Sequence, residues 1–190
     1  MSKRAEGTLS ALDAIYVRRS IRAFTRENVE QSTIRGLLDA AVQAPTAMHE
    51  QPWVFAVVQD AAVLRRLSDR AKAMWMKEAV APRDRHLTEE SNLHGAFLTR
   101  LEDPAFNVFY NATTLIVICA RRTDPFVTAD CWLAAENLML AACALGLGTC
   151  CIGAAVPALN TPAFSRKNGR FSGKKSGKRV RLTCWSSTSA

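Results

Sequence analysis

The residues best suited to chemistry begin with an arginine-rich corner, Arg18-Arg19-Ser20-Ile21-Arg22. Three guanidinium groups and one hydroxyl lie within five residues, and each arginine offers a fork of donors that can make paired, charge-assisted hydrogen bonds to a phosphate. A solvated basic corner would have the same composition. The corner is therefore a candidate phosphate contact that needs support from elsewhere in the chain.

A second candidate is the stretch APTAMHEQPW, residues 44–53. Pro45 and Pro52 restrict the backbone of what reads as a loop between a helix and a strand, and the small residues between them would let a flat ring approach the main chain. Thr46 and Gln51 supply neutral donors and acceptors. His49 has no serine or aspartate partner in view, so a structural role is the alternative to catalysis.

The third candidate is LGLGTCCIG, residues 145–153. Glycines at a helix end and beside a short strand permit a ligand to approach backbone N–H groups closely, although a simple helix C-cap would also need them. The spacing is not the GxGxxG that opens a helix after a strand, which disfavours a Rossmann site. P-loop, HExxH and GxSxG motifs are absent from the sequence as well.

Periodicity predicts the elements that must position these segments. The longest helical patterns cover residues 29–42, with Asn28 as a plausible N-cap, and residues 61–79. An apolar helix is expected from about residue 129 to 145, ended by glycines. The opening segment has Leu12, Ile15 and Tyr16 at helical spacing.

Compact apolar runs predict buried strands at residues 53–58 (WVFAVV) and 114–120 (TLIVICA), and residues 149–152 are a candidate third strand. Residues 82–103, which include His86 and His94, show no sustained period and are compatible with short helices in an excursion. Helices alternating with strands indicate one layered α/β or α+β domain with helices on both faces of a sheet, spanning residues 1–164.

Charge is distributed unevenly along the chain. The formal net charge is +8, and residues 165–190 contain eight basic residues and no acidic ones, which leaves 17 basic and 17 acidic residues before them. We therefore treat residues 165–190 as a separate basic tail, whose abrupt change of composition suggests disorder or a shifted reading frame. If the tail is foreign, we expect an outer strand to be missing from the sheet.

The six cysteines show neither a CxxC pair nor the paired spacing of a zinc site, so we expect reduced thiols and no metal. No apolar run reaches the roughly 18 residues of a membrane span, and the first residues lack the apolar segment of a signal peptide. A cytoplasmic location and no membrane contact are the resulting expectations.

Taken together and in this order, RRSIRAF, APTAMHEQPWVF, TLIVICA and the helix leading into GLGTCCIG resemble the nitroreductase family. The resemblance covers roughly residues 10–162. It implies an α+β fold, layered α/β/α, with a central, mostly antiparallel sheet flanked by helices. It also implies FMN as the bound cofactor and a homodimer with FMN at the interface.

The resemblance further implies which residues bind the cofactor. The corner would contact the flavin phosphate and ring, the 45–51 loop would touch FMN from the partner subunit, and the last strand would face the ring near its reactive nitrogen. His49 and Cys151 replace the family's more common Asn and Trp. The candidate residues are Arg18, Arg19, Ser20, Arg22, Pro45, Thr46, Ala47, His49, Gln51, Cys151, Ile152 and Gly153.

The implied activity is electron transfer from NAD(P)H to a small oxidised acceptor, such as a nitroaromatic, a quinone or a flavin, by a ping-pong hydride transfer. No catalytic side chain is expected, because the flavin carries the chemistry. Two alternatives stay open. The protein would bind flavin without turnover, or the basic tail would bind nucleic acid or an anionic surface, for which the formally neutral body leaves the tail as the only candidate.

Overall fold

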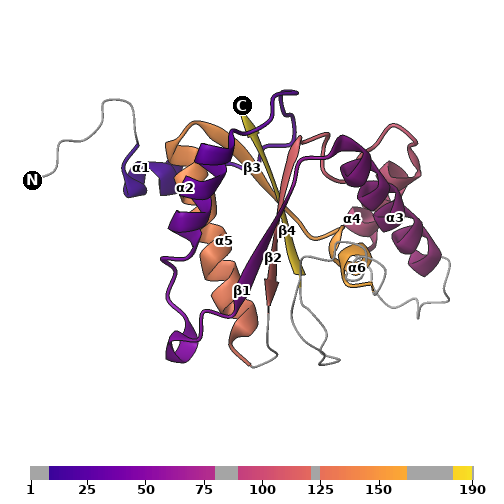
Figure 1. Ribbon diagram of the computed structural model, residues 1–190. Coiled ribbons are helices and arrows are strands. Elements are labelled where there is room, and N and C mark those ends of the chain that lie inside the picture. Colours follow the sequence, from indigo (N-terminus) through magenta and orange to yellow (C-terminus); the bar gives the residue numbers. More distant parts are fainter. Residues whose placement is uncertain (1–8, 80–89, 121–124, 162–181, 190) are drawn as a thin grey trace, which may run out of the picture.

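The computed structural model describes residues 9–79, 90–120, 125–161 and 182–189. Its centre is a four-stranded sheet in the order β1-β2-β4-β3, and every neighbouring pair is antiparallel (Figure 1). The predicted antiparallel sheet is therefore confirmed. The strands are β1 (Trp53–Val58), β2 (Thr114–Ala120), β3 (Leu147–Ile152) and β4 (Leu182–Ser189).

Strand β2 shows why the sheet needs cover on both faces. All seven of its residues are buried. Successive side chains of a strand point to opposite faces, so Leu115, Val117 and Cys119 join one apolar cluster, whereas Ile116, Ile118 and Ala120 join the other. An uninterrupted apolar run in the sequence thus corresponds to a strand with a hydrophobic layer on each side.

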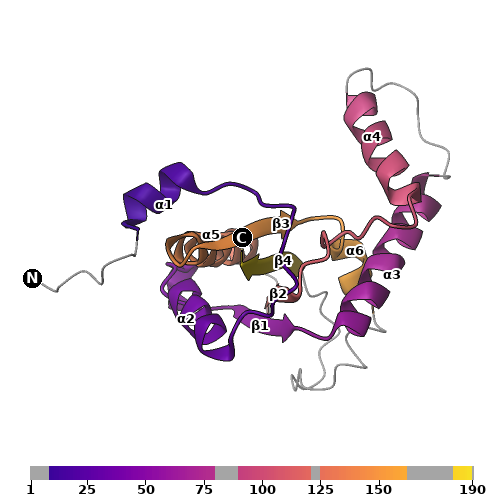
Figure 2. The same cartoon turned by 90° about the horizontal axis from the view of Figure 1, so that it is seen from above.

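Helices supply those two layers. In Figure 1 one group of helices lies to the left of the sheet and a second group to the right, and Figure 2 shows the same arrangement from above. The layered α+β architecture is confirmed. None of the described helices is long and apolar enough to cross a membrane. The left-hand helices are α1 (Ala11–Val17), α2 (Gln31–Ala41) and α5 (Val127–Ala144), and the right-hand ones are α3 (Ala61–Ala79), α4 (Glu90–Glu102) and α6 (Val156–Leu159).

Two helix predictions need correction. Asn28 is not an N-cap, because α2 begins at Gln31 with Glu30 as its cap residue and no side-chain cap bond. Tertiary hydrogen bonds fix this entry instead: Gln59 Nε2 donates to the Val29 carbonyl oxygen over 2.8 Å. Helix α1 forms as predicted, but Ala14 is its buried residue, and the apolar residues Leu12, Ile15 and Tyr16 are exposed in the single chain.

The C-terminal segment differs from expectation more deeply. Leu182–Ser189 form β4, which pairs with β2 through Val117 opposite Cys184 and with β3 through Ile152 opposite the same residue. Residues 182–189 of the predicted tail thus form an internal strand of the sheet, and the expected loss of an outer strand stays a prediction. Residues 162–181, the rest of the predicted tail, lie outside the described part of the chain.

Candidate functional site

The arginine corner lies along the edge strand β3. Ser20 forms a parallel β-bridge with Thr149, and the Ile21 N–H donates to the Thr149 carbonyl oxygen over 2.9 Å. The approach is close at Gly148, where an added Cβ would meet the Ile21 side chain at 3.0–3.1 Å. Two of the three segments singled out in the sequence are thereby brought together.

Each arginine of the corner has a different surrounding. The Arg18 Nε is 4.0 Å from Glu136 Oε1 on α5. The Arg19 Nη1 donates over 2.8 Å to the Tyr16 carbonyl oxygen and over 2.8 Å to that of Arg18, so its guanidinium caps the end of α1. Arg22 lines a cavity. Of these three arginines, Arg22 is therefore the one placed to contact a ligand in the cavity.

The cavity has a volume of about 340 Å³ and lies at the end of β3. The volume falls in the range of small-molecule pockets, and its mostly apolar lining with a few polar groups is typical of them. It contains the predicted residues Arg22, Cys151, Ile152 and Gly153, together with residues that the sequence did not single out. These further lining residues are Trp75, Phe97, Phe106, Val108, Tyr110, Cys150 and Ala154.

Four aromatic rings form the wall opposite β3, in two edge-to-face pairs. The Trp75 and Phe97 ring centroids are 5.6 Å apart, and those of Phe106 and Tyr110 are 5.7 Å apart. Trp75 is fixed further, because its Nε1 donates to the Ala154 carbonyl oxygen over 2.8 Å. Helices α3 and α4 thereby place flat apolar surfaces beside the backbone of β3.

The segment between α4 and β2 presents Phe106 and Tyr110 through an irregular backbone. Tyr110 and Asn111 both lie in the left-handed region, with φ of 55° and 59°. Strain of this kind concentrates at functional sites. Lys72 Nζ donates to the carbonyl oxygens of Asp103 and Phe106, over 2.6 and 3.0 Å. Sequence reasoning missed this segment, although its closely spaced aromatic and asparagine residues were a local signal for it.

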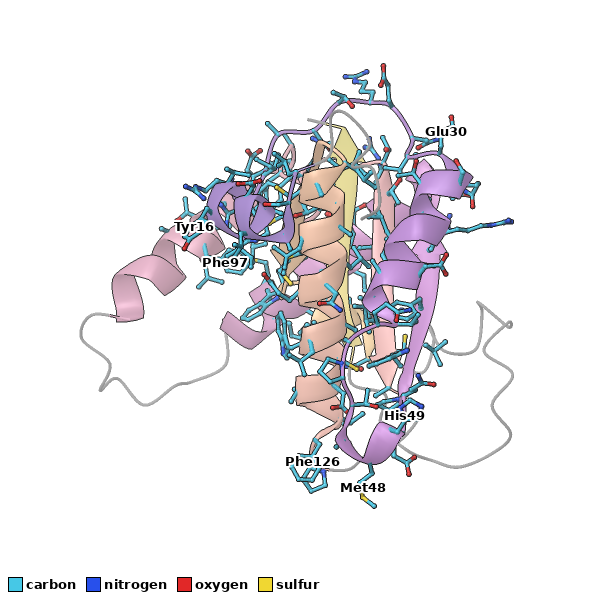
Figure 3. All side chains as sticks on the ribbon, turned by 90° about the vertical axis from the view of Figure 1, so that its left-hand side faces the viewer. Tyr16, Glu30, Met48, His49, Phe97 and Phe126 are labelled. Carbon is cyan, nitrogen blue, oxygen red and sulfur yellow. The ribbon has the colours of Figure 1, made fainter. Side chains whose placement is uncertain are left out.

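The predicted loop of residues 45–51 lies elsewhere. Figure 3 shows Met48 and His49 near the same end of the molecule as Phe126, far from Tyr16 at the other end of that face. A buried carboxylate holds the loop, because the Ala47 N–H donates to Asp130 Oδ1 over 3.2 Å. Within one chain the structure does not bring the loop to the cavity, and none of its residues lines it.

The loop backbone is unusual. Met48, His49 and Gln51 have φ of 52°, 57° and 44°, in the left-handed region that costs free energy for residues other than glycine. The Gln51 N–H donates to Thr46 Oγ1 over 3.3 Å, which closes the loop on itself. The Met48 side chain is 93% exposed. The loop is thus held in one strained shape with an apolar side chain projecting outward.

The two cavity thiols are neutral. Burial raises the pKa of Cys151 to about 11, with Cys150 and Glu136 adding to the rise and Arg18 opposing it. Burial also raises the pKa of Cys150, against the lowering influence of the Arg22 charge and hydrogen bond. A thiol must ionise to act as a nucleophile. These two cysteines therefore line the cavity as uncharged side chains. His86 lies outside the described residues, and the side chain of His94 does too.

These features fit a flat ring that carries negative charge. Nothing lies within 4 Å of a Cβ placed on Gly153, so a planar group can approach the backbone there. Aromatic rings cover the other side, and Arg22 supplies a positive charge at the rim. The residues present are therefore suited to an isoalloxazine ring.

Comparison with known proteins agrees with this geometry. A putative NADH dehydrogenase/NAD(P)H nitroreductase of Archaeoglobus fulgidus is 32% identical over 75% of this chain and 66% of its own length. A protein of the same name from Methanothermobacter thermautotrophicus is 28% identical over 74% of this chain and 59% of its own length. This chain thus spans less than two thirds of either relative.

Among solved structures, an FMN-bound nitroreductase of Bacteroides fragilis superposes with a TM-score of 0.75 at 24% identity, over 96% of this chain and 89% of that one. This similarity establishes the nitroreductase-like fold. The model of the nitroreductase family matches residues 15–158. Since that match covers most of the sequence and includes both the corner and the end of β3, the chain belongs to the nitroreductase family.

Proposed function

We propose that the protein is an FMN-dependent oxidoreductase that moves electrons from NAD(P)H to a small oxidised acceptor. The observation that carries the proposal is the cavity in which Arg22, the open backbone at Gly153 and a wall of aromatic rings meet. FMN-bound relatives of the same fold and the NAD(P)H nitroreductase names of the curated relatives support the choice of cofactor and donor.

The residues of the chain have binding roles in this proposal. The corner, Arg18 to Arg22, holds the phosphate and the polar edge of the ring, with Arg22 closest to the cavity. The backbone of Ile152 and Gly153 faces the ring, where N–H groups stabilise negative charge that develops on it. Cys151 stays neutral at pH 7 because its pKa is about 11, so it does not compete as a nucleophile.

The reaction needs no acid–base pair of side chains. When held by the corner and the Ile152–Gly153 backbone, FMN would supply the hydride- and electron-transfer chemistry. For a nitroaromatic acceptor, NAD(P)H and one proton convert the nitro group to a nitroso group and water, and NAD(P)⁺ leaves. Because the cavity is small, donor and acceptor use it in turn, which is a ping-pong sequence.

We further propose that the active form is a homodimer. On the face seen in Figure 3, Tyr16, Met48 and Phe126 all present apolar surface, and Tyr16 is 74% exposed. Leu12 and Tyr16 are exposed one helical turn apart on α1, and clustered exposed apolar surface marks an interaction site. A second copy on this face would also bring its strained 45–51 loop toward the first copy's cofactor, as the family resemblance implies.

Steady-state kinetics test the proposal. The full-length protein with added FMN should oxidise NADH or NADPH when a quinone or nitroaromatic is supplied. Varying both substrates should give parallel double-reciprocal lines, the signature of a ping-pong sequence. Bound FMN without any NAD(P)H oxidation would contradict the enzyme assignment and favour a flavin-binding protein without turnover.

A further inference from the structure

Positive charge gathers around the aromatic wall of the cavity. Arg22 and Arg100 both approach the Tyr110 ring, with the Cζ atoms 5.9 and 5.8 Å from its centroid. The Arg100 Cζ is also 4.9 Å from the Phe106 centroid. These distances lie within the range of cation–π attraction. Two guanidinium groups therefore border the rings that an incoming acceptor would meet.

Negative charge near them comes from Asp103, three positions after Arg100, whose Oδ1 accepts a hydrogen bond from the Ala105 N–H over 2.8 Å. No aspartate or glutamate is among the described residues that line the cavity. Glu102 lies two positions from Arg100 on α4, and residues two apart on a helix face different directions. The Lys72 ammonium adds a third positive charge beneath Phe106, where it donates to the backbone. Arg22, Arg100 and Lys72 together outnumber the Asp103 carboxylate, so this edge of the cavity carries a net positive charge.

The two arginines have separate tasks if FMN occupies the cavity. Arg22 lines the cavity beside Cys150, where the proposed function assigns it to the cofactor. Arg100 belongs to α4 and contacts the Phe106 and Tyr110 rings without itself lining the cavity, and both arginine side chains are exposed to solvent. Arg100 is therefore the cation that remains for the second substrate.

Resting on the proposed function, we propose that the site selects flat aromatic acceptors that carry a negative charge, such as an aromatic carboxylate with a reducible nitro group. The acceptor ring lies against Phe106 and Tyr110, and Arg100 pairs with its anionic group. Arginine suits this role because its planar fork matches a carboxylate while its face stacks on aromatic rings. An exposed ion pair of this kind changes affinity by about three- to fivefold and weakens as salt rises.

A matched pair of ligands tests the proposal: 4-nitrobenzoate and its neutral analogue 4-nitrobenzamide. Both are titrated by calorimetry into the full-length protein with added FMN, at low and moderate salt, and both are then compared as acceptors by kcat/KM. The variants are Arg100→Gln, which removes the charge, and Arg100→Lys, which keeps it. Arg35→Gln is the control, because Arg35 is an exposed arginine on α2 across the sheet.

We expect the wild type to favour 4-nitrobenzoate about three- to fivefold, and this ratio to fall to near one in Arg100→Gln and at moderate salt. Arg100→Lys should keep most of the ratio, and Arg35→Gln all of it. A ratio that stays unchanged in Arg100→Gln would overturn the proposal, as would equal losses for both ligands. Calorimetry needs no turnover, so the ratio decides the proposal even if NAD(P)H oxidation, and with it the proposed function, fails.

Discussion

At the scale of single residues, Gly148 is the point where the arginine corner depends on the shape of β3. Replacing it with alanine would place a Cβ 3.0–3.1 Å from three atoms of the Ile21 side chain, whose backbone is hydrogen-bonded to Thr149. Overpacking of this kind costs about 1–3 kcal/mol. We expect Gly148→Ala to lower the midpoint of denaturant unfolding and to weaken FMN binding by displacing the corner.

The control for this prediction is Gly36→Ala on α2. Nothing lies within 4 Å of a Cβ at Gly36, and alanine is the better helix former by about 1 kcal/mol, so stability should rise slightly. Combining Gly148→Ala with Ile21→Ala should recover part of the loss, since two of the crowding atoms are removed. Additive losses in that double variant would contradict the contact argument.

A second residue-scale prediction concerns the buried thiol of Cys119. Burial, together with neighbouring Cys131, raises its pKa from 9.0 to about 12. Because the folded state favours the neutral thiol, the stabilisation is fully present below about pH 9 and is lost as the pH rises from about 9 to about 12. The free energy of unfolding should therefore fall over this range more steeply in the wild type than in Cys119→Ala. Parallel curves would show that this thiol does not contribute.

At the scale of elements, Lys72 on α3 ties down the segment that presents Phe106 and Tyr110. Lys72→Met keeps the length of the side chain and removes two hydrogen bonds to backbone carbonyl oxygens. We expect a loss of about 1–3 kcal/mol in unfolding free energy and a raised KM for the acceptor, with FMN affinity less affected. Lys77→Met, at an exposed position of the same helix, should match the wild type. Equal effects of the two substitutions would contradict this role.

The elements also show what the sequence could predict. β1, β2 and α3 were predicted with the bounds that the structure gives them, because each is a strongly patterned segment between polar or turn-forming residues. β4 could not be recognised, since LTCWSSTS lacks an apolar run and acquires its place through pairing with two strands distant in sequence. Local pattern carries no information about such pairing.

The sequence could likewise predict only one part of the candidate site. The arginine corner and the glycine-containing segment around β3 stand out in the sequence, because such dense clusters of arginine or of glycine have few common structural explanations. The aromatic wall of the site was missed because Phe106 and Tyr110 are aimed by a left-handed backbone and by Lys72, more than thirty residues away. The placement of the 45–51 loop in a complete site stays a prediction that depends on a second subunit.

At the scale of the whole molecule, the exposed apolar face of α1 predicts self-association. Leu12 and Tyr16 are 65% and 74% exposed and lie one helical turn apart. Replacing both with glutamate would bury unpaired charges in a dimer, which is costly. We expect the wild type to show twice the 20.8 kDa chain mass by light scattering, and the double variant to show the single mass and weaker FMN binding.

Ala73→Glu is the control for this prediction, because it adds the same charge to an exposed position of α3 on the opposite side of the sheet (Figure 1). It should remain dimeric. A wild type that is monomeric at all concentrations, or a double variant that stays dimeric, would exclude α1 as the interface.

The most direct test of the account is a titration of the purified, full-length protein with FMN, followed by flavin absorbance and fluorescence. We predict saturable binding, weakened about tenfold or more in Arg22→Ala, because hydrogen bonds to charged groups contribute about 1.5–3 kcal/mol. Arg26→Ala, at an exposed position four residues further on, should bind as the wild type does. A colourless protein that takes up no added FMN, or an Arg22→Ala variant of undiminished affinity, would contradict the central claim that this cavity holds a flavin.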